Sequence, residues 1–263
     1  MELTILQSII FGVVQGVTEF LPISSSGHLV ILQDIMGINQ PHVSFFVALH
    51  IGSLLAVIVY FWNDWLNIFH LKKDMSVYRE NPRLLWYIIV ATIPAAIVGF
   101  FFNDRAESLV FPPIATAFLI VIGSFILFVI DWFFASKRTM KDVTVGNAIV
   151  VGLAQILALI PGVSRSGMTI AGGRMCQLSR DDAARFSFLI ATPIIAGAGI
   201  MQLGHLFTGG ATASIVIGMV TTFFAAIGTI HYFLIFIKKV SYVVFLYYAL
   251  ILFTVVSIIF LRR

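Results

Sequence analysis

The sequence predicts an all-α membrane protein that crosses the bilayer several times. Its 263 residues are 60% hydrophobic and only 11% charged, and the mean hydropathy is +1.03. Soluble domains have about 25% charged residues on average, so most of the surface of this chain must face lipid. Two further observations support this fold class: six long apolar stretches, and two broken hydrophobic regions that resemble each other.

Six uninterrupted apolar stretches are long enough to cross a bilayer as helices. A helix needs about 20 apolar residues to span ~30 Å of hydrocarbon. We expect the six transmembrane helices at Val43–Trp62, Leu84–Phe102, Ile114–Phe134, Phe186–Leu203, Ser214–Ile237 and Tyr242–Leu261. The first hydrophobic segment has no positively charged residue before it, so we do not expect a cleaved signal peptide.

Two further hydrophobic regions are too long for one straight helix and are broken near their middle. Ile5–Asp34 and Asn147–Cys176 are each about thirty residues long, and proline, serine and glycine interrupt both. The pattern predicts two re-entrant pairs of half-helices, each pair entering and leaving on the same side. Irregular backbone inside a membrane is tolerated only where protein or a water-filled cavity covers it, so each break indicates a functional site.

The two broken regions are related by an offset of 140 residues. In this register the polar matches are Gln15 with Gln155, Ser24 with Ser164, Ser26 with Ser166, and Gly27 with Gly167. Composition alone explains apolar matches, but it does not explain these polar ones at the broken place in each half. The sequence therefore predicts a single membrane domain built from two repeats, at about residues 1–136 and 145–263.

Each predicted repeat contains three full spans, so the second repeat must enter the membrane from the opposite face. Inverted-topology repeats with broken helices are a known membrane architecture. On this topology one face carries twelve of the sixteen Lys and Arg, namely Lys72, Lys73, Arg79, Arg83, Lys137, Arg138, Lys141, Arg174, Arg180, Arg185, Lys238 and Lys239. Basic residues favour the cytoplasmic side, so both termini are expected outside.

The first broken region carries a carboxylate in an apolar setting. Gln15 and Glu19 are four residues apart and share one helix face. A carboxylate costs a few kcal/mol in lipid, so Glu19 should face the protein interior with a partner. The alternative is a structural role, in which Glu19 caps the next half-helix or pairs with a cation.

Three serines follow Pro22, where a new half-helix can begin. Ser24, Ser25 and Ser26 suit a helix N-terminus, whose free N–H groups attract anions. A serine cluster alone is more often a cap than a nucleophile, but His28 lies three residues after Ser25 and imidazole commonly activates a hydroxyl. For the other histidines, the structural interpretation is preferred at His42, His50, His70, His205 and His231.

The second broken region contains Arg165, a permanent cation between Ser164 and Ser166. A guanidinium matches phosphate oxygens with two parallel hydrogen bonds. The alternative, a structural ion pair with Glu19, is compatible with this, since an anion could replace the carboxylate. A phosphorylated lipid could reach such a site while its tail stays in the bilayer.

Two segments resemble the signature motifs of the undecaprenyl-pyrophosphate phosphatases, the integral-membrane family associated with bacitracin resistance. They are Gln15-x-x-x-Glu19 with the following Phe-Leu-Pro-x-Ser-Ser-x-Gly-His, and Pro161-Gly-x-Ser-Arg-Ser-x-x-Thr169. The resemblance covers the whole chain. It implies hydrolysis of undecaprenyl pyrophosphate to the monophosphate, which is reused in cell-wall synthesis, in the cell membrane and with a site that opens to the outer face.

The resemblance also implies roles for individual residues. Ser25 would be the nucleophile, His28 an acid/base, and Glu19 an assistant or a metal ligand, while Arg165, Ser164 and Thr169 would grip the pyrophosphate. The neighbouring motif residues expected at the substrate are Gln15, Ser24, Ser26, Gly27 and Ser166. A divalent metal, magnesium or calcium, is implied too, although Gln15 stands where many members have Glu and removes one carboxylate from a metal cage.

The main alternative is a transporter or flippase for polyprenyl phosphate, because inverted repeats also suit alternating access. The asymmetry of the two turns favours an enzyme, since Arg165 stands opposite Ser25 and Met168 opposite His28. An ion channel would need more deep carboxylates than Glu19. No nucleic-acid partner is expected, and the sequence leaves open the prenyl length, a homodimer, a phosphoserine intermediate and any coupling to lipid flipping.

Overall fold

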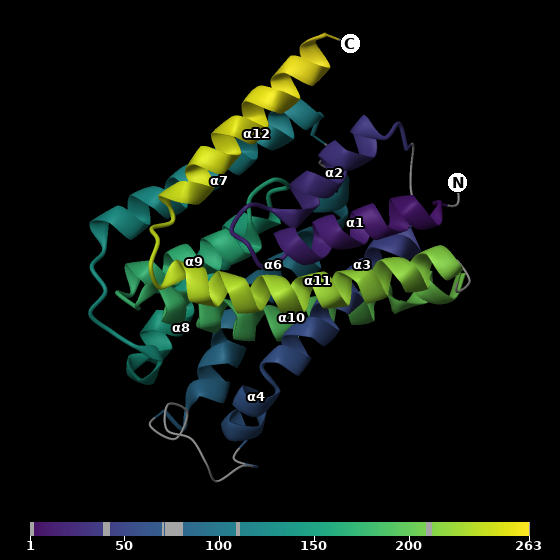
Figure 1. The fold of residues 1–263 in the computed structure, drawn as a ribbon. Helices are drawn as coiled ribbons and strands as arrows, with labels where there is room; N and C mark the ends of the chain where they lie inside the picture. Colours follow the sequence, from purple (N-terminus) through teal and green to yellow (C-terminus); the bar gives the residue numbers. More distant parts are fainter. Residues whose placement is uncertain are drawn as a thin grey trace.

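The computed structural model is all-helical (Figure 1). It describes residues 3–38, 43–69, 71, 81–108, 111–208 and 212–262, without the side chains of 102–108 and 203–208. Within these ranges there is no β-strand, and Arg138 and Leu178 form an isolated bridge. The all-α prediction is therefore confirmed.

Six helices of the described chain are long and apolar enough to cross a membrane. They are α3 (Val43–Tyr60), α6 (Leu84–Ser108), α7 (Pro113–Phe133), α10 (Arg180–Thr208), α11 (Ala213–Ile237) and α12 (Val243–Leu261). Large apolar side chains such as Phe101, Trp132 and Leu261 are exposed on them. Such a surface is stable in lipid but not in water, so the six predicted spans and the multi-pass membrane protein are confirmed.

Both broken regions are broken where the sequence predicts. The first forms α1 (Ile5–Thr18) and α2 (Ser25–Ile35), and the second forms α8 (Val145–Ile156), the 3₁₀ turn η2 (Leu157–Leu159) and α9 (Arg165–Met175). A short helix, α4 (Trp62–Ile68), and a 3₁₀ turn, η1 (Met140–Asp142), lie in the connections.

The first helix of each broken region begins with the same capping box. Thr4 and Gln7 exchange side-chain to backbone bonds at the start of α1, and Thr144 and Asn147 do so at the start of α8. These pairs are 140 residues apart. The reciprocal bonds satisfy backbone donors that a helix start leaves open, which matters more in lipid than in water.

Glycines let helices from distant parts of the chain approach closely. A Cβ on Gly12 or Gly16 of α1 would lie 2.7 or 2.6 Å from backbone oxygens of α11, and one on Gly152 of α8 would lie 2.7 Å from the Ala91 carbonyl of α6. Small residues at such crossings are the usual way to pack helices in a membrane. The helix α1 thus packs on α11, and α8 packs on α6.

A buried ion-pair network centred on Asp131 joins α7 to α9, α10 and the start of α12. Arg174 Nε and Arg180 Nη2 lie 2.8 and 2.9 Å from its carboxylate oxygens, and the Ser241 hydroxyl donates to it at 3.1 Å. Arg174 also donates to Ser136 Oγ and to the carbonyls of Phe134 and Leu178. Two basic residues of the predicted cytoplasmic face, Arg174 and Arg180, therefore share one buried carboxylate.

Not every residue of that predicted basic face is described. Lys72, Lys73 and Arg79 lie outside the described residues. Arg174 is 2% exposed and fully engaged with Asp131 and its neighbours, so it is a structural cation rather than a solvated residue of that face.

Candidate functional site

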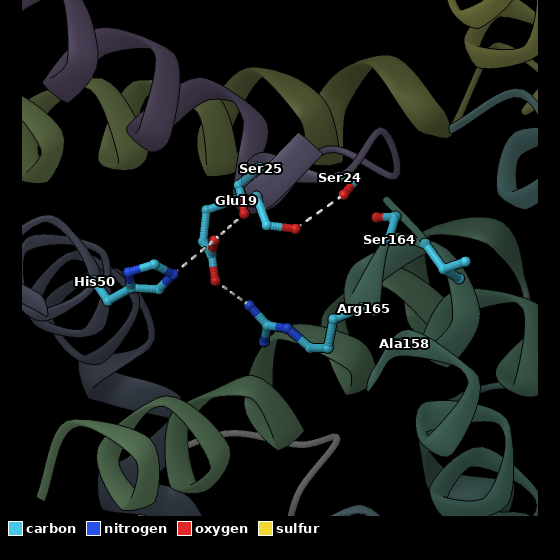
Figure 2. Close-up of a pocket in the computed structure, with 9 residues that line it drawn as sticks. Glu19, Ser24, Ser25, His50, Ala158, Ser164 and Arg165 are labelled. Carbon is cyan, nitrogen blue, oxygen red and sulfur yellow. Dashed lines mark hydrogen bonds and ion pairs between the residues drawn. The ribbon is translucent and has the colours of Figure 1, made fainter. Parts of the chain in front are cut away.

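A pocket of about 170 Å³ lies where the turn between α1 and α2 meets the start of α9 (Figure 2). The helix α3 contributes one further wall through His50. The lining residues are Glu19, Ser24, Ser25, Ser26, His50, Ala158, Val163, Ser164 and Arg165. The two broken regions, far apart in sequence, are thus brought together at one cavity.

The helices α2 and α9 begin in the same way. Ser24 Oγ accepts from the N–H of Gly27 at 3.3 Å, and Ser164 Oγ accepts from the N–H of Gly167 at 3.1 Å. Serine caps a helix start through this bond, so the capping interpretation holds for Ser24 and Ser164. Capping leaves Ser25 and Arg165, the first residues of the two helices, free to serve the pocket.

Ser24 has a backbone conformation that is unusual for a residue with a side chain. Its φ is +66°, whereas Ser164 at the equivalent place has a φ of −72°. Positive φ in a non-glycine residue costs about 1–3 kcal/mol and is found mostly at functional sites. Ser24 directly precedes Ser25, so this strained turn presents Ser25; Gln177, after α9, is the other described non-glycine residue with positive φ.

Glu19 connects the side chains on the walls of the pocket. Its Oε2 accepts from the Ser25 hydroxyl at 2.5 Å and from Gln15 Nε2 at 2.9 Å, while its Oε1 accepts from Arg165 Nη2 at 2.5 Å. Glu19 is 7% exposed, so a charged carboxylate is stable there only with such partners. The predicted interior partner of Glu19 is confirmed, and it comes from the other half of the chain.

Arg165 reaches the pocket from the first turn of α9. Its side chain is 17% exposed, and it binds protein through Nη2 to Glu19. A guanidinium has five N–H donors, so most of its donors remain for a ligand in the pocket. Positive charge at a helix N-terminus suits an anion, since the open backbone N–H groups add to the attraction.

Two further predicted substrate residues hold the site together and do not line the pocket. Ser166 donates to the carbonyl of Leu21 at 2.8 Å and so ties the start of α9 to the first turn. Thr169 lies 2.6 Å from the hydroxyl of Ser187 on α10. Their placement supports a positioning role for both side chains.

His28 lies beside the pocket and both of its ring nitrogens are engaged. Nδ1 lies 2.7 Å from the Ser24 carbonyl, and Nε2 lies 2.7 Å from the Tyr248 hydroxyl of α12. A carbonyl only accepts, so Nδ1 carries a hydrogen, and in the neutral ring Tyr248 then donates to Nε2. The structure records no bond between His28 and Ser25, and the acid/base role of His28 stays a prediction.

Gln15 and Gly27 also stand next to the pocket without lining it. Gln15 is fully buried and supports Glu19 through Nε2, but its Oε1 has no partner among the described residues. A Cβ on Gly27 would lie 2.9 Å from the Ile120 side chain of α7. Gly27 therefore serves close packing of α2 on α7.

His50 is a pocket residue that the sequence analysis missed. Its Nε2 lies 4.0 Å from Glu19 Oε2, and its Nδ1 lies 2.8 Å from the Phe46 carbonyl. One signal could have found it, because an imidazole in the otherwise apolar span Val43–Tyr60 is costly in lipid and should face the interior. His231, by contrast, is exposed, and its Nδ1 lies 3.3 Å from the Tyr60 hydroxyl, as in a structural histidine.

The pocket does not form a complete metal site from protein groups. Among the described residues, no three His, Cys, Asp or Glu side chains are grouped in a way that could hold a metal. Glu19 is the carboxylate that lines the pocket, and both of its oxygens already accept hydrogen bonds. Magnesium is typically held by one or two carboxylates plus substrate phosphates, so this donor set does not fit a resident ion.

The chain matches the family model described as bacitracin resistance protein BacA over residues 8–255. It is 40% identical over 257 residues to a protein of Desulforudis audaxviator named undecaprenyl-diphosphatase, which covers 98% of both chains. Proteins with the same name from Moorella thermoacetica and Thermodesulfovibrio yellowstonii are 38% and 39% identical. The first covers 99% of this chain and 100% of the relative, and the second covers 98% of both.

Proposed function

This chain belongs to the bacitracin resistance protein BacA family, and we propose that it hydrolyses undecaprenyl pyrophosphate to undecaprenyl monophosphate and inorganic phosphate. The reaction returns the carrier lipid to cell-wall synthesis. The relatives are named for a diphosphatase, which favours hydrolysis over lipid transport.

One observation carries the chemical proposal: Glu19 bonds Ser25 through one oxygen and Arg165 through the other. We assign Ser25 as the nucleophile, Glu19 as the base and Arg165 as the anion clamp, and all three line one pocket. Phosphoryl transfer depends mainly on positioning and on stabilising charge. The arrangement supplies both.

In the proposed first step the pyrophosphate displaces Glu19 from part of its contact with Arg165. The Ser25 hydroxyl gives its proton to Glu19 Oε2, to which it already donates at 2.5 Å. Its Oγ forms a bond to the terminal phosphorus, the bridging P–O bond breaks, and the electron pair leaves with the lipid monophosphate. Arg165 stabilises the charge that develops on the phosphoryl oxygens.

Symmetric contacts support the proposed inverted repeat and its re-entrant helix pairs. The contact of α1 with α11 has a counterpart in the contact of α8, which begins 140 residues after α1, with α6. The matching caps at Thr4 and Thr144, and at Ser24 and Ser164, extend the correspondence. We take the repeats to be about 1–136 and 145–263 in one domain, in the cell membrane, with the pocket open to the outer face.

Divalent-metal dependence is part of the proposal, with the metal entering on the substrate. A magnesium or calcium ion bound to the pyrophosphate would neutralise phosphate charge, and Glu19, the carboxylate in the pocket lining, would assist in holding it through the oxygen that Arg165 gives up. Phosphate release should then fall on chelation and return with magnesium or calcium. Full activity of chelated, metal-free protein would remove the metal from the proposal.

The test is phosphate release from farnesyl or undecaprenyl pyrophosphate by the purified protein in detergent. Ser25→Ala removes the nucleophile, Glu19→Gln removes the base, and both should reduce turnover by at least about 100-fold. Arg165→Ala should cost about 100- to 1,000-fold, as expected for loss of a transition-state donor. His28→Ala tests the predicted acid/base role of His28 and should also lose most of the activity while the protein stays folded.

Ser8→Ala is a matched control, because Ser8 is also a buried serine but bonds Thr4 at the far end of α1. It should keep wild-type turnover. Full hydrolysis by the Ser25→Ala protein would exclude serine attack, and lipid translocation by a wild type that releases no phosphate would establish the transporter alternative.

A further inference from the structure

His50 occupies a place in the pocket that the first step does not use. It comes from α3, which belongs to neither broken region, and its side chain is 39% exposed. Figure 2 shows its ring directed at Glu19, on the other side of that carboxylate from Arg165. Its ring therefore faces the carboxylate that the first step uses.

The hydrogen bond at the far side of the ring decides which nitrogen can react. Nδ1 lies 2.8 Å from the Phe46 carbonyl, which can only accept, so Nδ1 carries a hydrogen. In the neutral ring the free lone pair is then on Nε2, the nitrogen that faces Glu19 and the pocket. A second partner that fixes the ring in this way is typical of an imidazole that accepts protons.

A second base is needed because the first step consumes Glu19. Once Glu19 has taken the Ser25 proton, it cannot also take a proton from the water that must attack phosphoserine. The other described groups lining the pocket are serine hydroxyls, the Arg165 guanidinium and two apolar side chains, besides His50. His50 is the one with a lone pair suited to accept a proton.

We propose that His50 is the catalytic base of the second half of the reaction, an inference that rests on the proposed phosphoserine route. A water oxygen bonds to the phosphoserine phosphorus and one water proton passes to His50 Nε2. The P–Oγ bond breaks, and Ser25 Oγ takes back the proton held by Glu19. Inorganic phosphate leaves, and His50 returns its proton to solvent.

The end state of this step agrees with the geometry of the pocket. It leaves a protonated His50 next to an ionised Glu19, and the two are 4.0 Å apart, at the limit of an ion pair. Opposite charges at this distance stabilise each other more strongly in a partly buried site than in water. The exposed edge of His50 lets the proton leave afterwards.

The experiment is a rapid-quench measurement of both products with His50→Gln, using farnesyl pyrophosphate labelled in the terminal phosphate. We expect a fast release of about one farnesyl monophosphate per chain, followed by turnover reduced about 100-fold or more. The label should stay on the protein, and it should be lost in the double variant with Ser25→Ala. The amplitude of the fast phase measures the number of folded active sites per chain. A misfolded variant would show no such phase and so would not imitate this result.

His231→Gln is the matched control, since His231 is also a histidine of a transmembrane helix but bonds Tyr60 away from the pocket. It should behave as wild type. Added imidazole should partly restore turnover to His50→Ala, which a purely structural role would not allow.

Two results would overturn the assignment while leaving the proposed function intact. One is wild-type turnover by His50→Gln. The other is that His50→Gln releases farnesyl monophosphate and inorganic phosphate at equally reduced rates, without a fast phase. If Ser25→Ala hydrolyses at the wild-type rate, the phosphoserine route itself fails, and with it the premise of the His50 proposal.

Discussion

At the residue scale, the proposed chemistry depends on one carboxylate, Glu19, and on the groups that surround it. Glu19 accepts from Ser25, Gln15 and Arg165, and His50 stands 4.0 Å away. Each donor stabilises the carboxylate, and in the proposed first step a phosphate oxygen takes the place of the carboxylate at Arg165. A single buried acid can therefore serve as structural ion pair before substrate arrives and as base afterwards, so the two interpretations of Glu19 and Arg165 do not conflict.

Replacing Arg165 with lysine should separate charge from shape. Lysine keeps the positive charge but loses the planar fork that binds two phosphate oxygens at once. We expect phosphate release by Arg165→Lys to fall about 100-fold, with the protein still folded. Steady-state phosphate release against substrate concentration is the measurement.

Arg185→Lys is the control for that substitution, because Arg185 pairs with Asp64 at 3.6 Å outside the pocket. It should retain wild-type turnover. Wild-type turnover by Arg165→Lys would show that a point charge is enough, and that the guanidinium fork is not used.

At the element scale, the first helix of each broken region is held in place by close contact with a helix from the other half of the chain. Gly12 and Gly16 of α1 meet backbone atoms of α11, and the Thr222 hydroxyl of α11 donates to the Gly12 carbonyl at 3.1 Å. Helices in lipid gain little from hydrophobic burial against each other, so van der Waals contact and such bonds must hold them together. The position of the first turn therefore depends on residues more than 200 positions away.

Gly16→Ala should destabilise the packing of α1 on α11. A Cβ there would lie 2.6 Å from the Thr222 carbonyl oxygen and 2.7 Å from the Ala225 Cβ. Overpacking of this kind costs about 1–3 kcal/mol, so the melting temperature in detergent should fall.

Gly228→Ala is the matched control, since Gly228 is also a helical glycine and nothing lies within 4 Å of its ideal Cβ. Alanine favours a helix over glycine by about 1 kcal/mol, so this variant should be unchanged or more stable. Equal melting temperatures for the two variants would contradict the close contact at Gly16.

At the scale of the whole molecule, the pocket and the Asp131 network lie at opposite ends of α9. Arg165 begins this helix, and Arg174 near its end is bound to Asp131 of α7. Arg180 and Ser241 bring α10 and the start of α12 to the same carboxylate. The network thus fixes the far end of the helix that begins with Arg165.

Asp131→Ala should strongly destabilise the fold, because it leaves the buried Arg174 charge without its carboxylate. Removing one partner of a buried ion pair costs about 3–5 kcal/mol. The measurement is thermal unfolding in detergent, with soluble aggregate monitored in parallel.

Asp181→Ala provides the comparison, since its partner Lys238 is 3.7 Å away and both side chains are substantially exposed. Exposed pairs contribute about 0–1 kcal/mol, so its melting temperature should stay near wild type. If the melting temperature of Asp181→Ala fell as far as that of Asp131→Ala, burial would not explain why the Asp131 ion pairs stabilise the fold.

The sequence by itself determined the helical class, the six spans, the two breaks and the motif residues Ser25 and Arg165. The length of an apolar segment and the free-energy cost of a polar residue within it depend only on that segment, so both can be judged from the sequence one segment at a time. The caps at Ser24 and Ser164 also follow from local rules, since each bonds an N–H three residues on.

Only the tertiary structure decided which residues meet in the pocket. It joined Glu19 to Arg165 across 146 positions, turned His28 toward Tyr248 of α12, and brought His50 of α3 to the carboxylate. These contacts depend on how helices cross, which is set by small residues and packing over the whole chain rather than by any motif. The residues of the two turns were therefore predictable, whereas the histidine that faces their shared carboxylate was not.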